Sequence, residues 1–325
     1  MIQTLDNFLT WSEHRAKTLN TCPRQYAYRY IEAWEGWLKD APLSKQHAYW
    51  LNAIIADLRI VTGNIVHDRA GRIVRRLASA MQVVPSTEIT IAEEDFDKFI
   101  SNSRKLPLSS LSSKRKKLLA DLLQQPLPAT FVASERESIS KMLHNFFDLP
   151  EVALFRSNPD CLLRDFAEAE LGPPTNELKV PSRLMTDAVF SDDQVTVVLD
   201  WKTGKPRPGH RDKGIVYDLF VRNRLGMSES DRILVRFIYL RSGERTEFEF
   251  TPEERLETLW RVGEEFAYMQ EKSSDPVLNI ASLDAFRAQT GFHCLSCAHQ
   301  LICEQFAKDS ARGFFKRFQG AEVCE

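Results

Sequence analysis

Two aspartates and a lysine near the middle of the chain could together bind a divalent metal ion. The segment LMTD ends at Asp187, and the segment LDWKTGK contains Asp200 and Lys202. Carboxylate oxygens bind Mg²⁺ or Mn²⁺, the bound ion polarises a phosphate and lowers the pKa of a water molecule, and an ammonium group can orient that water. These residues therefore suit hydrolysis of a phosphodiester bond. The alternative is a surface hairpin whose charged side chains simply face water.

The spacing of these residues also predicts how they lie in a sheet. Residues 194–202 alternate, so Asp200 and Lys202 share one strand face while apolar residues fill the other, which we expect to be the core. A strand over 182–190 precedes it. If Phe190 pairs with Val195, Asp187 lies opposite Val198 and diagonal to Asp200. A slip of one residue would place the two carboxylates on opposite faces.

A local group of basic residues follows this strand. The chain is nearly neutral, with a net charge of -2, so any site for a polyanion must be local. The loop after Lys202 is suited to binding phosphates through Lys205, Arg207, His210, Arg211 and Lys213. A solvated loop is the alternative, and it is our interpretation of the second basic run, at 114–117. The Gly204-Lys205 pair does not form a phosphate-binding P-loop, because Leu199 stands where its first glycine is required.

The cysteines suggest a second metal site. Cys294, Cys297 and Cys303 have the spacing C-x2-C-x5-C, and thiolates favour an iron-sulphur cluster or zinc over a hard cation. Cys22, which Pro23 follows, is the candidate fourth ligand, and the site would join the two ends of the chain. His293 or His299 could replace a thiolate in a zinc site. The alternative is a set of buried free thiols.

Composition excludes several classes of protein. The 325 residues are 43% hydrophobic and 27% charged, a globular balance, and no run approaches the roughly 18 apolar residues that span a bilayer. The first residues lack the pattern of a secretory signal, so we expect a cytoplasmic protein. Six cysteines in such a chain favour metal binding or catalysis over a disulfide framework.

The elements that must position these residues form two groups. The first third is helical: residues 12–19 begin a helix, Cys22-Pro23 interrupts it, and Tyr26, Tyr30 and Trp34 form a stripe that predicts core packing. A longer helical pattern over 46–81 is broken at Gly63 and carries His67 beside its apolar face. Short amphipathic helices follow over 92–150.

After residue 164 the pattern becomes alternating. We expect strands at 165–171, 182–190, 194–202, 231–240 and 245–250, with helices at about 213–224 and 252–272. A strand, a helix and a strand in succession predict a parallel crossover. The fold class is therefore mixed α/β. We divide the chain into an N-terminal helical part (1–81), an inserted helical lobe (82–160), an α/β core (161–275) and a C-terminal cysteine region (276–325).

Together these motifs make the chain resemble the RecB-like branch of the PD-(D/E)XK nucleases that carry an iron-sulphur cluster, such as the CRISPR-associated exonucleases and the nuclease domain of AddB. SEHRAKTLNTCPRQYAYRY resembles the opening helix of that family, GNIVH its histidine motif, and LMTD with LDWKTGK its D…D-x-K core. The C-terminal cysteines match its cluster ligands. The resemblance covers about 12–35, 63–77, 164–240 and 290–306.

The resemblance implies a restriction-endonuclease-like mixed sheet flanked by helices and metal-dependent cleavage of DNA, commonly single-stranded and from an end. His67, Asp187 and Asp200 would bind Mg²⁺ or Mn²⁺. Tyr217 matches the tyrosine of the family's Q-x-x-x-Y motif, whereas Lys213 stands at the position of its glutamine. The implied ligands of a 4Fe-4S cluster are Cys22, Cys294, Cys297 and Cys303.

Two alternatives stay open at this point. The chain could be a DNA-binding or scaffold subunit with little or no catalysis, which Lys213 and the unmatched lobe at 82–160 favour; that lobe could dock a helicase or another protein. Zinc could also replace the cluster. Repair, CRISPR adaptation and antiphage defence are all compatible with the sequence.

Overall fold

A mixed four-stranded sheet forms the centre of the protein. The structure is a computed structural model that describes residues 6–163, 180–182, 184–192, 195–275 and 277–312, so the strand predicted at 165–171 lies outside the described residues. The strands β3 (Ala188–Asp192), β4 (Val195–Lys202), β5 (Arg232–Tyr239) and β6 (Glu244–Phe248) lie in that order. Within this sheet, β4 and β5 are the only parallel pair among the described strands. Helix α9 (Gly209–Leu225) connects them, which confirms the predicted crossover.

The register of the β3–β4 hairpin differs from the expected one by two residues. Phe190 pairs with Val197, and Asp192 pairs with Val195. Pairing therefore continues closer to the turn than we predicted. Because side chains alternate with a period of two, an even shift leaves each residue on its expected face. Asp187 and Asp200 still share a face and lie closer together than predicted.

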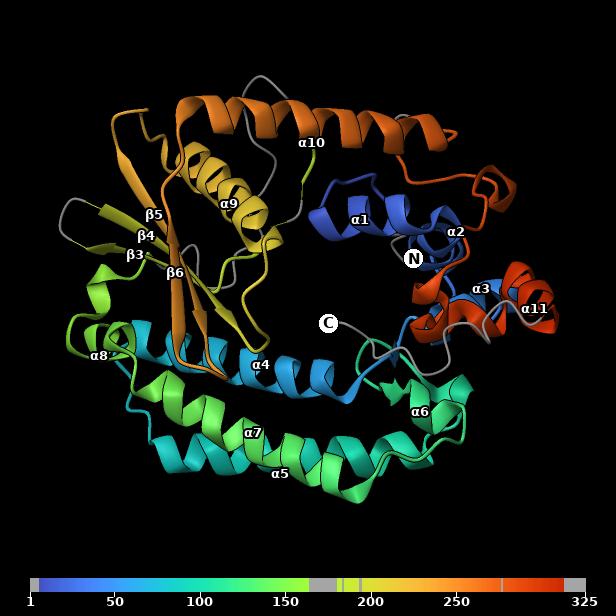
Figure 1. The fold of residues 1–325 in the computed structure, drawn as a ribbon, viewed down its shortest axis with the longest axis horizontal. Helices are drawn as coiled ribbons and strands as arrows, with labels where there is room; N and C mark the ends of the chain where they lie inside the picture. The colour runs from blue at the N-terminus through green and yellow to red at the C-terminus, as the bar shows by residue number, and fades with distance from the viewer. Residues whose placement is uncertain (1–5, 164–179, 183, 193–194, 276, 313–325) are drawn as a thin grey trace.

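Helices cover both faces of this sheet (Figure 1). One face packs on α4 (Leu58–Ala78), α5 (Pro85–Lys105), α7 (Ala129–Phe147) and α8 (Pro150–Ser157), and the other packs on α9 and α10 (Pro252–Lys272). One face of β4 is core, as expected, and the face that carries Asp200 is also largely buried. Val198, on the face of Asp200, is as buried as Leu199 on the opposite face. The carboxylate of Asp200 therefore lies at the end of an apolar surface.

The N-terminal region consists of short helices. The Ser12 hydroxyl accepts a hydrogen bond from the Arg15 N–H and caps α1 (Glu13–Thr21), and Pro23 begins α2 (Pro23–Ala27). A π-helical turn (Tyr28–Glu32) continues α2, and α3 (Leu43–Leu51) follows. A parallel bridge between β1 (Ile54–Ile55) and β2 (Lys117–Leu118) leads to α6 (Leu119–Leu122). The remaining short elements are the 3-10 turns Leu108–Ser110, Pro159–Cys161, Leu283–Ala285, Phe292–Ser296 and Ala298–Leu301, and helix α11 (Glu304–Ala311).

Helix α4 runs through Gly63 without interruption, contrary to our prediction of a break there. The chain instead leaves the helical conformation before Leu58, which Asp57 precedes as N-cap. A Cβ atom on residue 63 would lie 2.7 Å from Thr203 Oγ1. Gly63 therefore permits close approach of α4 to the loop after β4.

The helices of segment 82–160 share a core with the sheet. The rings of Phe146, on α7, and Trp201, on β4, lie 5.2 Å apart. Asn145 Nδ2 donates a hydrogen bond to the Leu240 carbonyl at 2.7 Å. The segment thus supports the strand that carries Asp200. Within the residues that the structure describes, no helix has the length and apolarity to cross a membrane.

Candidate active site

The end of β4 brings both predicted aspartates together. The Asp187 N–H donates to the Leu199 carbonyl at 3.2 Å, and Asp187 Oδ2 accepts a hydrogen bond from the Trp201 N–H at 2.7 Å. These backbone contacts fix Asp187 beside β4 although it lies just before β3. Burial raises the pKa of the Asp187 carboxyl, and the charge of Asp200 acts in the same direction.

Asp200 is surrounded by hydrogen-bond donors. Lys202 Nζ lies 2.8 Å from Oδ1 and 2.7 Å from Oδ2 of Asp200. Oδ2 also lies 2.9 Å from Lys213 Nζ and accepts a hydrogen bond from the Tyr217 hydroxyl at 2.7 Å. Burial alone would raise the pKa of Asp200, but the ammonium groups of Lys213 and Lys202 outweigh it and hold the pKa well below its usual range. Asp200 is therefore a permanent anion.

The two lysines respond differently to this environment. Burial lowers the pKa of Lys202 despite the nearby Asp200 carboxylate. For Lys213 the same burial is outweighed by Asp200, and its pKa is raised. Lys213, at the position where the resembling family has glutamine, thus forms a stable ion pair in the site. Two carboxylates and two ammonium groups nearly balance their charges.

Helix α4 adds His67 to this group. His67 Nδ1 lies 3.5 Å from Asp187 Oδ1. Burial would lower the pKa of His67, but its hydrogen bond to Asp187 and the charges of Asp187 and Asp200 raise it. Gly63, one turn earlier, allows α4 to approach Thr203 closely and so places His67 beside the two aspartates.

Sequence analysis missed a third acidic residue near the site. Burial raises the pKa of Glu13, at the start of α1, and the Lys213 and Lys202 ammonium groups partly oppose that shift. Glu13 therefore lies within electrostatic reach of both lysines. The signal was weak in the sequence, because an acidic residue after an N-cap serine is common at any helix start.

The basic loop only partly surrounds the carboxylates. Lys205 and Arg207 are exposed, whereas Lys213 contacts Asp200. Arg211 forms an ion pair with Glu254 and lies over the rings of Phe248 and Phe250. His210 Nδ1 lies 2.7 Å from the Tyr239 hydroxyl, and burial lowers its pKa to about 4. His210 is therefore neutral at pH 7 and adds no charge to the loop.

The chemistry of this donor set suits a hard divalent cation. Two carboxylates and an imidazole are compatible with Mg²⁺ or Mn²⁺. Among the described residues, however, no three His, Cys, Asp or Glu side chains are arranged to hold a metal ion. The Asp200 oxygens already contact Lys202, Lys213 and Tyr217. Oδ2 carries three of these contacts and Oδ1 carries one, so an ion at Asp200 would share the carboxylate with the two ammonium groups.

All four predicted cysteine ligands line one pocket between the N-terminal helices and the C-terminal region. These are Cys22, Cys294, Cys297 and Cys303. Burial raises the pKa of Cys297 to about 12, although the backbone of His299 lowers it in part. These soft donors suit an iron-sulphur cluster or zinc. As at the carboxylates, no three His, Cys, Asp or Glu side chains among the described residues are arranged to hold a metal ion.

His299 also lines this pocket and is nearly fully buried. Its ring stacks on Tyr28 with the centroids 5.5 Å apart. Neither ring nitrogen has a hydrogen-bond partner in the described structure. Burial lowers its pKa to about 3, so the imidazole is neutral at pH 7. An imidazole with two unused nitrogens beside four thiols fits a pocket that binds a metal group.

Comparison with known proteins identifies one family. The family model described as the PD-(D/E)XK nuclease superfamily matches residues 10–304. That range includes His67, both aspartates, both lysines and all four cysteines of the pocket. No curated protein matches the chain significantly.

Proposed function

The chain belongs to the PD-(D/E)XK nuclease superfamily, and from this premise we propose that it is a metal-dependent deoxyribonuclease. The family implies a nuclease that acts on DNA and typically uses Mg²⁺ or Mn²⁺. The observation that carries the proposal is the placement of Asp187, Asp200 and the Lys202 ammonium group together at the end of β4.

Each residue has a distinct role in the proposed reaction. Asp187 and Asp200, with His67, would hold the ion, which polarises the scissile phosphate and activates a water molecule. Lys202, fixed by its contacts with both Asp200 oxygens, is placed to orient that water or to offset charge on the phosphate. The Tyr217 hydroxyl donates to Asp200 and orients its carboxylate.

We propose that the ammonium group of Lys213 gives way to the metal cation when the cation binds at Asp200. The ammonium groups of Lys213 and Lys202 compensate the two aspartates before a cation binds. A cation held at Asp200 would repel the Lys213 ammonium group, and the Lys213 side chain, which is 30% exposed, has room to turn toward a phosphate. Lys213 would then contact DNA together with Lys205, Arg207 and Arg211.

The finer details of the substrate are also part of the proposal. We propose exonucleolytic action on single-stranded DNA, by resemblance to the exonucleases named above. We further propose that the four cysteines hold a structural 4Fe-4S cluster, with zinc as the alternative. Residues 82–160 are the proposed contact region for a helicase or other partner protein.

The test of catalysis is cleavage of end-labelled DNA by the full chain, purified without oxygen, with Mg²⁺ or Mn²⁺. We expect Asp200→Asn to lower the cleavage rate by at least about a thousandfold, because a metal ion contributes several kcal/mol of charge stabilisation. Arg224→Gln, an exposed residue of α9, is the control and should cleave normally. Unchanged cleavage by Asp200→Asn would refute the assigned site. The product ladder separates trimming from internal cuts.

Metal analysis tests the cysteine pocket separately. A 4Fe-4S protein is brown and absorbs near about 400 nm, and Cys297→Ser should lose iron and that absorption. Cys161→Ser, a buried cysteine outside the pocket, should retain both. If the wild-type protein is colourless and contains one equivalent of zinc, the pocket holds zinc and not an iron-sulphur cluster.

A DNA-binding subunit without catalysis is the second candidate. The observation that favours it is the set of contacts that Asp200 makes with Lys202, Lys213 and Tyr217, which leaves the site nearly neutral without a cation. This candidate predicts DNA binding in EDTA and no cleavage with either metal. Metal-dependent cleavage by the pure chain would exclude it.

A further inference from the structure

A second pocket lies beside α1 and is lined by aromatic and basic residues. It has a volume of about 400 Å³. Its residues come from α1, the π-helical turn and the segment after it, α3, and the loop before β2, which Figure 1 shows away from the sheet. The aromatic members are Tyr30, Trp34, Trp37 and Tyr49, and the basic members are Arg15, Arg29 and Lys116.

The aromatic rings form a partly exposed surface rather than a closed core. Trp34 and Trp37 meet edge to face with centroids 5.2 Å apart, and Tyr49 contacts Trp37 at 5.9 Å. Trp37 remains 43% exposed. Of the stripe that we predicted to be core, Tyr26 is buried, but Tyr30 and Trp34 are only partly buried. Of the four rings, Trp37 is therefore the most accessible to a ligand.

The backbone holds this surface in place. Glu35 has a φ of 63°, a left-handed conformation that is unfavourable for a residue with a side chain. A Cβ atom on Gly36 would lie 2.3 Å from the Lys45 carbonyl oxygen, so this segment packs directly on α3. Trp37 is thus presented by a rigid turn, which reduces the ordering cost of binding.

The charge of the pocket is positive. Arg15 lies over the Tyr30 ring at 4.7 Å from its centroid, and Arg29 and Lys116 are exposed. Among the described residues, no carboxylate lines the pocket. Of the acidic residues next to lining residues in the chain, Glu35 is paired with Lys45 at 3.3 Å, and Asp6 and Glu32 adjoin Asn7 and Ala33. Lys116 belongs to the basic run that we interpreted as a solvated loop, and it now has a defined position at this pocket.

Aromatic faces beside cationic groups are the arrangement that binds unpaired nucleotides: a base stacks on the ring and the cations contact phosphates. We propose that this pocket binds a segment of single-stranded DNA, with Trp37 as the stacking residue and Arg29 and Lys116 as phosphate contacts. The inference rests on the proposed function for its choice of DNA. Helix α1 connects the two sites, because Glu13 lies near Lys202 and Lys213 while Arg15 lines the pocket.

The test measures binding of a fluorescein-labelled oligothymidylate of about 16 nucleotides to the full chain in EDTA. We expect Trp37→Ala to weaken binding about tenfold, the effect of losing one stacked base, and Trp37→Phe to retain most of the affinity. Lys116→Ala should reduce the salt dependence of binding. The matched control is Trp260→Ala, since Trp260 is 67% exposed on α10, and its affinity should stay within about twofold of wild type.

Several outcomes would overturn the proposal. It fails if Trp37→Ala, with a native circular dichroism spectrum, binds like wild type, or if Trp260→Ala loses as much affinity. It also fails if a duplex or an oligouridylate binds as tightly as oligothymidylate and loses affinity equally in Trp37→Ala. These binding measurements are made without metal and are therefore independent of cleavage. If Trp37→Ala binds like wild type while cleavage still depends on Asp200, the DNA-binding pocket is refuted and the proposed nuclease is not. If Trp37→Ala loses affinity while cleavage does not depend on Asp200, the nuclease site is refuted and the pocket is not.

Discussion

Two buried aspartates, one that contacts helix α9 and one that lies on it, are neutralised in different ways. Asp200, on β4, is 3% exposed and contacts the ammonium groups of Lys202 and Lys213. Asp218, on α9, is 1% exposed and lies 3.5 Å from guanidinium nitrogens of both Arg222 and Arg255. Both sites balance a buried charge, but only the first is open to solvent through Lys213.

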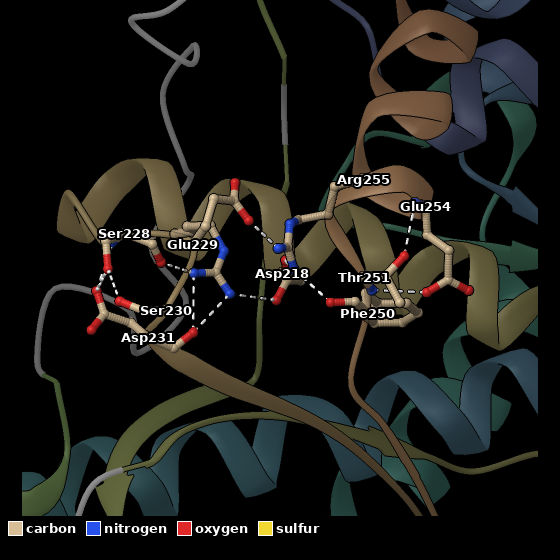
Figure 2. Close-up of polar contacts among 10 residues, drawn as sticks. Asp218, Ser228, Glu229, Ser230, Asp231, Phe250, Thr251, Glu254 and Arg255 are labelled. Atoms are coloured by element: carbon tan, nitrogen blue, oxygen red, sulfur yellow. Dashed lines mark hydrogen bonds and ion pairs between the residues drawn. The ribbon is translucent and has the colours of Figure 1, made fainter.

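The arginine cluster holds elements together (Figure 2). Arg255 donates to the Phe250 carbonyl at 2.6 Å and forms an ion pair with Glu229. Arg222 donates to the Asp231 carbonyl at 3.1 Å and also contacts the Ser228 carbonyl. The two guanidinium groups therefore connect α9 to the start of α10 and to the loop before β5.

The pKa values of the two aspartates shift in opposite directions. Burial raises the pKa of Asp218, and the charges of Arg222 and Arg255 do not overcome it. At Asp200 the charges of Lys213 and Lys202 outweigh burial and lower the pKa. A guanidinium has a planar set of donors that is used here by several fixed acceptors, whereas an ammonium is a point charge on a flexible chain. The arginine cluster around Asp218 is therefore suited to stability, and the lysine pair at Asp200 is suited to exchange for a metal cation.

The largest effect that we expect from this comparison is on stability. Arg255→Met should lower the free energy of unfolding by about 3 kcal/mol, because it leaves Asp218 buried with one fewer charge partner. Arg224→Met, an exposed residue of α9, the helix that carries Asp218, is the control and should change it by less than about 0.5 kcal/mol. Denaturant titration measures both variants. Equal stability of Arg255→Met and wild type would contradict the structural role of this cluster.

A smaller effect is expected on metal affinity. Lys213→Gln removes the ammonium group that competes for Asp200, so Mn²⁺ should bind about tenfold more tightly. Calorimetry without DNA measures this directly. Lys205→Gln, an exposed lysine of the preceding loop, should not change the affinity. If both variants bind Mn²⁺ like wild type, the Lys213 ammonium does not compete with the metal.

The smallest effect concerns the edge of the arginine cluster. Glu229→Gln should lower the free energy of unfolding by less than about 1 kcal/mol, because the Glu229 side chain is 64% exposed and water screens its ion pair with Arg255. The same denaturant titration applies. A loss as large as that of Arg255→Met would make Glu229, rather than Asp218, the important partner of Arg255.

Local signals allowed several elements to be predicted well. Helix α10 begins and ends at the predicted residues, because Thr251 and Glu254 form a capping box and Pro252 occupies the first turn. The parallel crossover followed from a strand, a helix and a strand of suitable lengths. Such signals lie within a few residues of each other and need no tertiary contact.

Other features depended on distant contacts. Gly63 was interpreted as a helix break, yet its lack of a side chain serves the approach of Thr203, 140 positions later in the chain. The hairpin register is two residues from the expected one, because the pairing continues to Asp192 and Val195, next to the turn. Glu13 gave no signal that set it apart from other acidic residues, whereas His299 was marked only by its place among the C-terminal cysteines.

The sequence by itself determined the chemistry available to this protein. Two aspartates and a lysine in alternating positions, four cysteines at both ends of the chain, and a mixed order of strands and helices can all be recognised from residue types and spacing. Only the tertiary structure decided how these groups meet: it placed Lys213 against Asp200, His67 against Asp187, and Arg15, Trp37 and Lys116 around one pocket. The physical reason is that periodicity fixes the face on which a residue lies, whereas packing between distant elements fixes its neighbours.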